Sequence, residues 1–243
     1  MRNPHHGMLS PVAPRNSILW ESRNGLAGIE FALIAPVLLS MLAGVYDLTT
    51  AYIAWERVNL CAQAIDQVAT AQAANSIATN TLTKAQTSAA ASSAYAYLPG
   101  VLTPSATPFG VTVSSIVMTP VVPGCSGNTC LYTPHVAWSG VFQGAAGSRR
   151  PCDVVQGVSV ITQVADTASP SATTLPADVY SPAPLLVIDV TYTFKPLFYS
   201  FVSDITMRQS AYFSPRTGLS NNWIQYVFTA PDSTTLCAGY PSA

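Results

Sequence analysis

The segment Leu26–Tyr46, LAGIEFALIAPVLLSMLAGVY, decides the fold of this chain. It contains one ionisable side chain, Glu30, and about 20 apolar residues are enough to cross the hydrocarbon core of a bilayer as a helix. Three arginines and one acid precede it. The positive-inside rule therefore predicts a cytoplasmic leader over residues 1–25 and a single membrane span over residues 26–46. The span would lie in an inner membrane, with the rest of the chain periplasmic or extracellular.

The composition excludes two broad classes of protein. Hydrophobic residues make up 49% of the 243 residues and charged residues only 9%, whereas roughly 25% is typical of a soluble domain. A freely soluble cytosolic enzyme is therefore not expected. Lys and Arg number 10 against 11 Asp and Glu, with no basic run that could follow a phosphate backbone. We expect a lipid bilayer as a partner and no nucleic acid.

The helix is predicted to continue beyond the membrane span. Apolar residues recur after Asp47 at alternating gaps of three and four, which is typical of an amphipathic helix. These residues are Leu48, Ala51, Trp55, Val58, Ala62, Ile65 and Ala69. We expect one helix from about Leu26 to about Asn75, with this stripe packed against the chain's own sheet and second helix. An Ala-rich second helix, ending near Leu98 before Pro99 and Gly100, completes a helical stalk over residues 47–98.

From residue 99 to residue 243, Pro, Gly, Ser and Thr separate short apolar runs, as in antiparallel sheets. Strands are expected at Val111–Met118, Val154–Val164, Leu185–Phe194 and Ile205–Phe213. In the third of these, alternate residues from Leu186 onward should face the core, and the face that carries Asp189 should face water. The fold class is therefore α+β: a long transmembrane and amphipathic helix, a second helix and a small antiparallel sheet.

The segment between the last two strands, KPLFYSFVSD at residues 195–204, is too apolar for an ordinary loop. Its side chains must therefore be covered by something other than water. We expect it to pack over the sheet, with contact to the membrane as the alternative.

Four cysteines in the second half of the chain predict two disulfides that staple its long loops. They are Cys125, Cys130, Cys152 and Cys237. Such bonds persist outside the reducing cytosol, in agreement with the predicted topology. The sequence does not choose among the three possible pairings. A metal site is the weaker interpretation, because the spacing is not C-x-x-C and His135 is the one histidine outside the leader. Cys61, on the long helix, is expected to be a small packed residue.

The junction between leader and span, RNGLAGIEF at Arg23–Phe31, carries the functional signal. A basic leader ends in Gly25, four uncharged residues follow, and a carboxylate and an aromatic residue precede the apolar helix. This pattern resembles the class III signal of type IV pilin-like proteins. The longer stretch GLAGIEFALIAPVLL resembles the TadE-like family, pseudopilins of the tight-adherence (Tad, Flp) pilus system.

The resemblance implies a processing site formed by Gly25, Leu26, Glu30 and Phe31. A prepilin peptidase would cut after Gly25, which makes Leu26 the new amino terminus. The other implied partners are pilin or pseudopilin subunits and the Tad inner-membrane platform. A carboxylate in hydrocarbon costs at least ~2.5 kcal/mol, so Glu30 needs a partner. We expect the amino group of Leu26 on an adjacent subunit to be that partner.

We therefore expect a non-enzymatic subunit or assembly factor, acting in pilus assembly or adhesion, without cofactor or metal. The sequence contains no G-x-S-x-G, H-E-x-x-H or Gly-rich phosphate loop. The alternative is an uncleaved, membrane-anchored periplasmic binding module. A third possibility is an anchored hydrolase, whose catalytic pair the fold would have to assemble around His135 and Asp153.

Overall fold

The computed structural model describes residues 18–75, 81–97, 109–127, 129–143, 149–155, 157–198, 203–214, 223–229 and 232–241. Residues 1–17 of the predicted leader lie outside this range, as does the predicted end of the second helix at Leu98. The first elements are α1 (Ile18–Asn75), β1 (Thr81–Thr83), α2 (Lys84–Ser92) and the 3₁₀ turn η1 (Ser93–Ala96). The strands and turn that follow are β2 (Phe109–Pro120), β3 (Tyr132–Gln143), β4 (Thr162–Val164), β5 (Thr174–Pro176), η2 (Ala177–Val179), β6 (Leu185–Phe194), β7 (Ile205–Phe213), β8 (Gln225–Val227) and β9 (Thr235–Leu236).

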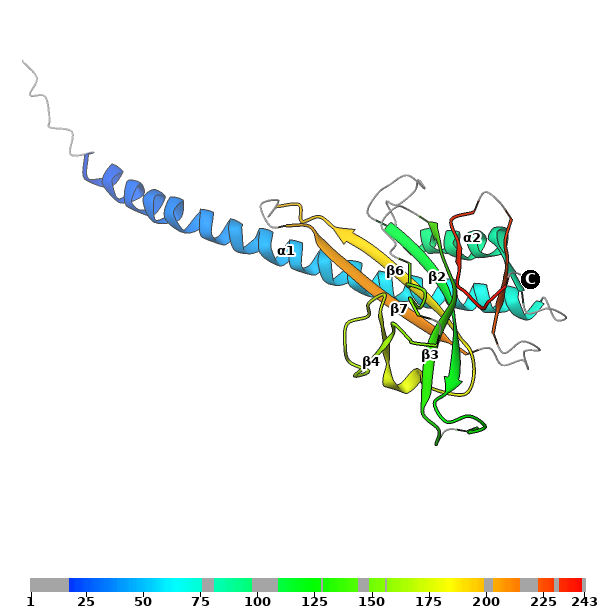
Figure 1. Ribbon diagram of the computed structural model, residues 1–243. Coiled ribbons are helices and arrows are strands. Elements are labelled where there is room, and N and C mark those ends of the chain that lie inside the picture. Colours follow the sequence, from blue (N-terminus) through cyan, green and yellow to red (C-terminus); the bar gives the residue numbers. More distant parts are fainter. Residues whose placement is uncertain are drawn as a thin grey trace, which may run out of the picture.

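Helix α1 is the longest element, with 58 residues and therefore a length of about 87 Å. Its first half projects away from the domain, and its second half lies against the sheet (Figure 1). It ends at Asn75 as expected but begins at Ile18, eight residues before the predicted start. Residues 18–25 contain no proline, and one glycine costs only about 1 kcal/mol in a helix interior. The helix therefore runs through Gly25 without a break.

The five-stranded sheet has the order β7-β6-β2-β3-β9, and all neighbouring strands are antiparallel. Strands β6 and β7 have the predicted bounds and pair with each other, with Ile188 opposite Ala211. The predicted strand Val154–Val164 is wrong: only β4 at its end is extended, and it pairs with β5 in parallel. Gly157 adopts a φ of 86° there, and Val155 and Val158 form an isolated bridge around it. Strand β3 was not expected from the sequence.

The main core lies between the sheet and the two helices. The second half of the amphipathic stripe, from Val58 to Ala69, is fully buried in it, which confirms the expected packing for this half. The first half of the stripe is not packed against the domain: Leu48 is 73% and Trp55 42% exposed. Helix α2 begins with a capping box in which Thr83 and Gln86 satisfy each other's backbone N–H groups.

A second core covers the opposite face of the sheet. Residues from β2, β3 and β6 meet the segment that contains β4 and β5. Because this segment covers the sheet, the face of β6 expected to be wet is buried. Asp189 is 1% and Thr191 6% exposed. The sheet is thus sandwiched between the helices on one side and an irregular layer on the other.

Two disulfides fix the loops, and the structure settles their pairing. Cys125 bonds to Cys130 at the tip of the β2–β3 hairpin. Cys152 bonds to Cys237, which joins the covering segment to the end of β9. Cys61 is a free, buried cysteine on α1, as expected.

Candidate functional site

The predicted processing residues all lie on the projecting half of α1. Gly25 and Leu26 are within the helix, and position 26 precedes Glu30 by about one helical turn. The side chains of Glu30 and Phe31 are exposed, Phe31 to 71%. A carboxylate and an aromatic ring at this end of α1 are therefore available to another molecule. The structure adds that all four residues of the motif lie on one continuous helix.

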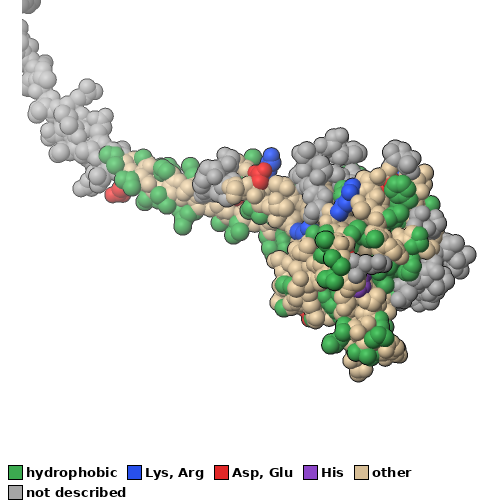
Figure 2. Space-filling view, viewed as in Figure 1, with side chains coloured by type: hydrophobic (Ala, Val, Ile, Leu, Met, Phe, Trp, Pro, Cys, Tyr) green, Lys and Arg blue, Asp and Glu red, His purple; other side chains and the backbone are tan. Residues whose placement is uncertain are grey.

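A row of exposed apolar side chains runs along the same helix, beginning at Phe31. Their spacing alternates between three and four residues, which is the heptad spacing of a helix–helix seam. The members of this α1 stripe are Phe31, Ile34, Leu38, Met41, Val45, Leu48, Tyr52 and Trp55, and all are between 42% and 73% exposed. Hydrophobic side chains protrude along the projecting helix in Figure 2. The stripe passes the end of the predicted span and continues for two further turns.

Helix α1 is long and apolar enough to cross a membrane, with a mean hydropathy of 2.0 in its most apolar window. None of the residues in that window is buried by the protein. A buried core helix of a soluble protein would satisfy the length criterion but not the exposure. The described structure therefore contains one candidate membrane anchor, close to the amino terminus.

Asp47, the first charge after the apolar segment, joins α1 to the β6–β7 connection. Its carboxylate accepts hydrogen bonds from the backbone N–H groups of Leu197 (3.0 Å) and Phe198 (3.1 Å). The Phe198 ring meets the Tyr46 ring edge to face, with centroids 5.5 Å apart. Asp47 is 7% exposed, but Leu197 is 67% and Phe198 56% exposed. The expectation that this connection packs over the sheet is therefore wrong for these two residues.

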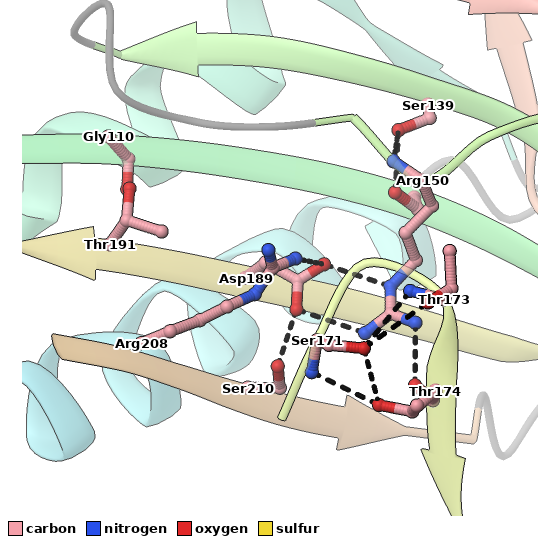
Figure 3. Close-up of polar contacts among 11 residues, drawn as sticks. Gly110, Ser139, Arg150, Ser171, Thr173, Thr174, Asp189, Thr191, Arg208 and Ser210 are labelled. Carbon is pink, nitrogen blue, oxygen red and sulfur yellow. Dashed lines mark hydrogen bonds and ion pairs between the residues drawn. The ribbon is translucent and has the colours of Figure 1, made fainter. Parts of the chain in front are cut away.

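A buried ionic cluster on the second face of the sheet was not anticipated. Arg150 donates from Nε and Nη2 to the two carboxylate oxygens of Asp189 at 2.8 and 3.0 Å, and from Nη1 to the Thr174 carbonyl (Figure 3). Asp189 also accepts a hydrogen bond from Ser210 and pairs with Arg208 at 3.2 Å. The cluster ties the covering segment to β6 and β7. All the groups that pair with Arg150 and Asp189 belong to this chain, so we assign the cluster a structural role.

The fold brings His135 and Asp153 together. His135 Nδ1 lies 2.5 Å from Asp153 Oδ2, and Asp153 Oδ1 accepts a hydrogen bond from the backbone N–H of Val160. Both side chains line a cavity of about 600 Å³, which Cys237 and Tyr240 help to close. Among the described residues, no hydroxyl group hydrogen-bonds to His135. The arrangement can therefore bind a polar group, and in the described part of the chain no side-chain hydroxyl nucleophile is hydrogen-bonded to the imidazole.

Two titratable groups are buried on the packed half of α1. Burial raises the pKa of the Cys61 thiol to about 12, so this thiol stays protonated and unreactive. Burial also raises the pKa of Asp66 to about 7. Asp66 is 9% exposed, and its Oδ1 finds no hydrogen-bond partner in the part of the chain that the structure describes.

These features define a class: a protein in which a long amino-terminal helix, apolar enough to anchor it in a membrane, continues into an α+β domain held by disulfides. Residues 25–65 match the family model described as TadE-like protein. The match begins at the glycine of the predicted processing site and confirms the resemblance seen in the sequence. It covers less than a fifth of the chain. The chain matches no curated protein and no solved structure.

Proposed function

We propose that this protein is a TadE-like pseudopilin, a non-enzymatic minor subunit or assembly factor of a Tad/Flp-type pilus. Residues 1–25 are the cytoplasmic leader, prepilin peptidase cuts after Gly25, and residues 26–46 hold the domain at the outer face of the inner membrane. The observation that carries the proposal is the family match, which starts at Gly25 and includes Glu30 and the apolar helix. Surface adhesion is a role of the assembled fibre to which such a subunit contributes.

The exposed half of α1 supports assembly through helix contacts. The α1 stripe has the spacing of a coiled-coil seam, and the domain leaves it uncovered. Beyond the span, where water would otherwise surround them, the exposed Leu48, Tyr52 and Trp55 can pack against a second helix of the same kind. The other subunits and the inner-membrane platform of the Tad system are the partners that such a surface fits.

Cleavage supplies a charge partner for Glu30. A carboxylate in hydrocarbon costs at least ~2.5 kcal/mol, and the side chain of Glu30 is exposed. Scission after Gly25 creates a cationic amino group at Leu26, near the same depth. In our proposal, the carboxylate of one subunit pairs with the amino group of its neighbour, which ties correct assembly to prior processing.

The test is mass spectrometry of the amino terminus after expression with and without a prepilin peptidase. We expect a chain that begins at Leu26 only when the peptidase is present. Gly25→Leu should block the cut, because a side chain at this position hinders entry of the backbone into a protease cleft. Gly28→Leu is the matched control, since an added Cβ at Gly28 meets nothing within 4 Å. A chain that retains Met1 in the presence of the peptidase contradicts the proposal.

The cavity beside His135 and Asp153 favours one second candidate, an uncleaved, anchored periplasmic binding module. This candidate predicts an intact Met1 and a small ligand that copurifies with the chain. Native mass spectrometry of the purified protein, compared with an Asp153→Asn variant, would detect such a ligand as an added mass that the variant loses. A chain beginning at Leu26 without added mass removes this candidate.

A further inference from the structure

We propose that Leu197 and Phe198, at the start of the β6–β7 connection, form a second membrane contact that enters the interfacial layer of the bilayer beside α1. The inference rests on the proposed function in one respect, namely that α1 spans the membrane. It adds that the α+β domain contacts the lipid surface directly, through Leu197 and Phe198, as well as being attached to the membrane by α1.

The first argument is position. Asp47 holds the backbone of Leu197 and Phe198 by two hydrogen bonds, and the Phe198 ring contacts Tyr46. The joined ends of β6 and β7 are also the part of the sheet that reaches furthest along α1 toward its projecting half (Figure 1). Leu197 and Phe198 are therefore held beside residues 46 and 47 of α1.

The second argument is depth. The apolar segment from Leu26 to Tyr46 has a length of about 30 Å as a helix, which equals the thickness of the hydrocarbon core. Tyr46 then lies at the outer boundary of that core, where tyrosine is enriched in membrane proteins. Whatever is fixed beside Tyr46 lies in the headgroup region. The carboxylate of Asp47 can occupy this boundary because backbone N–H groups satisfy it.

The third argument is the chemistry of the hairpin end. Leu197 and Phe198 leave more than half of their surface exposed, even though the Phe198 ring contacts Tyr46. Residues 196–203, PLFYSFVS, carry no charge. Lys195 and Asp204 flank them and pair at 3.7 Å, with side chains 74% and 52% exposed. Exposed Leu197 and Phe198 beside the hydrated pair of Lys195 and Asp204 match the polarity gradient of a lipid–water interface.

The experiment uses the full chain in lipid nanodiscs of phosphatidylethanolamine and phosphatidylglycerol, with a nitroxide attached to one introduced cysteine. The label site is Leu197→Cys, because Leu197 is exposed and, unlike Phe198, makes no ring contact. Leu38→Cys in the span is the lipid reference. Val122→Cys, 64% exposed on the distant β2–β3 hairpin, is the water reference. The unmutated chain is the labelling blank, since Cys61 is buried.

Paramagnetic resonance then compares the collision of each label with oxygen, which concentrates in lipid, and with a water-soluble nickel chelate. We expect an oxygen-to-nickel ratio at position 197 several-fold above that at position 122 and below that at position 38. A ratio at position 197 equal to that at position 122, with position 38 still in lipid, overturns the membrane contact alone. A water-like ratio at position 38 overturns the membrane anchor and this inference with it.

Discussion

The backbone N–H of Leu197 donates a hydrogen bond of 3.0 Å to Asp47 Oδ1 and so joins the β6–β7 connection to a point on α1 150 residues earlier. A charged acceptor with two backbone donors is among the stronger contacts available to a surface loop. The contact lies where the projecting half of α1 meets the packed half. It therefore helps to set the angle between the helix and the domain.

Replacing Asp47 should release the β6–β7 connection. Asp47→Ala removes the acceptor from both N–H groups and should reduce the local protection of residues 197 and 198 by roughly 1–3 kcal/mol. Asp47→Asn keeps one acceptor oxygen without the charge and should have a smaller effect. Hydrogen–deuterium exchange of the peptide that contains these amides measures the change. Gln63→Ala, at an exposed position on the same helix, is the control, and equal exchange in all four proteins would disprove the role of Asp47.

The buried cluster around Asp189 makes a graded stability prediction. Asp189→Leu leaves the guanidinium of Arg150 buried without its carboxylate and should lower the free energy of unfolding by about 3–5 kcal/mol. Arg150→Met should cost less, because Arg208 and Ser210 still satisfy Asp189. The double variant Arg150→Met/Asp189→Leu should cost less than the sum of the two. Urea denaturation of the full chain in detergent gives the three values, and additivity would show that the pair is not coupled.

The two disulfides should differ in their contribution to stability because they close loops of different length. Chain-entropy arguments give about 4–5 kcal/mol for Cys152–Cys237 and about 2 kcal/mol for Cys125–Cys130, whose separations are 85 and 5 residues. Replacement of each pair by alanine, followed by urea denaturation, measures this difference. Neither pair should react with an alkylating reagent before reduction. Free thiols at Cys125 and Cys130 in the exported protein would contradict the assignment to an oxidising compartment.

The sequence predicts well those elements whose residue pattern fits only one type of secondary structure. The apolar segment and the three–four spacing after it define α1, and the alternation of apolar and polar residues from Ile188 to Phe194 defines most of β6. The last polar residue of that strand, Thr193, does lie at its less buried end. In these segments local pattern and tertiary packing favour the same structure.

The buried ion pair shows why the second face of the sheet was not predicted. Asp189 alternates with core residues in β6, and a charged residue at such a position usually faces water. Its burial depends on Arg150, which is 39 residues away in the chain and lies in an irregular segment without periodicity. The one available signal was a charged residue within an apolar strand in a chain of low charge. Contacts of this range leave no local pattern, and the same holds for Asp47 with Leu197.

Glu30 provides the prediction closest to the proposed function. Glu30→Ala should leave membrane insertion intact or improve it, because a costly carboxylate is removed from the apolar segment. Assembly should be impaired, since the amino group of Leu26 on a neighbouring subunit loses its partner. Glu30→Gln keeps the size of the side chain but removes its charge, and assembly of this variant should be impaired as well. Membrane fractionation and recovery of the assembled complex measure the two effects, and normal assembly of both variants would rule out the pairing mechanism.

Asp66 should make the stability of the protein depend on pH between about 4 and 7. Burial raises its pKa from 3.8 to about 7, so in this range the folded chain binds a proton that the unfolded chain releases. Stability contributed by this protonation is fully present below pH 4 and is lost as the pH rises to about 7, by an amount on the order of 4 kcal/mol over the whole range. Asp66→Asn has no carboxyl group to ionise, and it should flatten the dependence and be more stable than the unmodified chain at pH 8.

Urea denaturation at pH 5 and pH 8 in detergent checks this sign. Asp178→Asn, which changes an exposed carboxylate, is the control and should leave the pH dependence as it is. Asp66 lies on the packed half of α1 next to the fully buried Ile65, so its ionised form is disfavoured by burial. If Asp66→Asn retains the full loss of stability between pH 5 and pH 8, the dependence arises from another group.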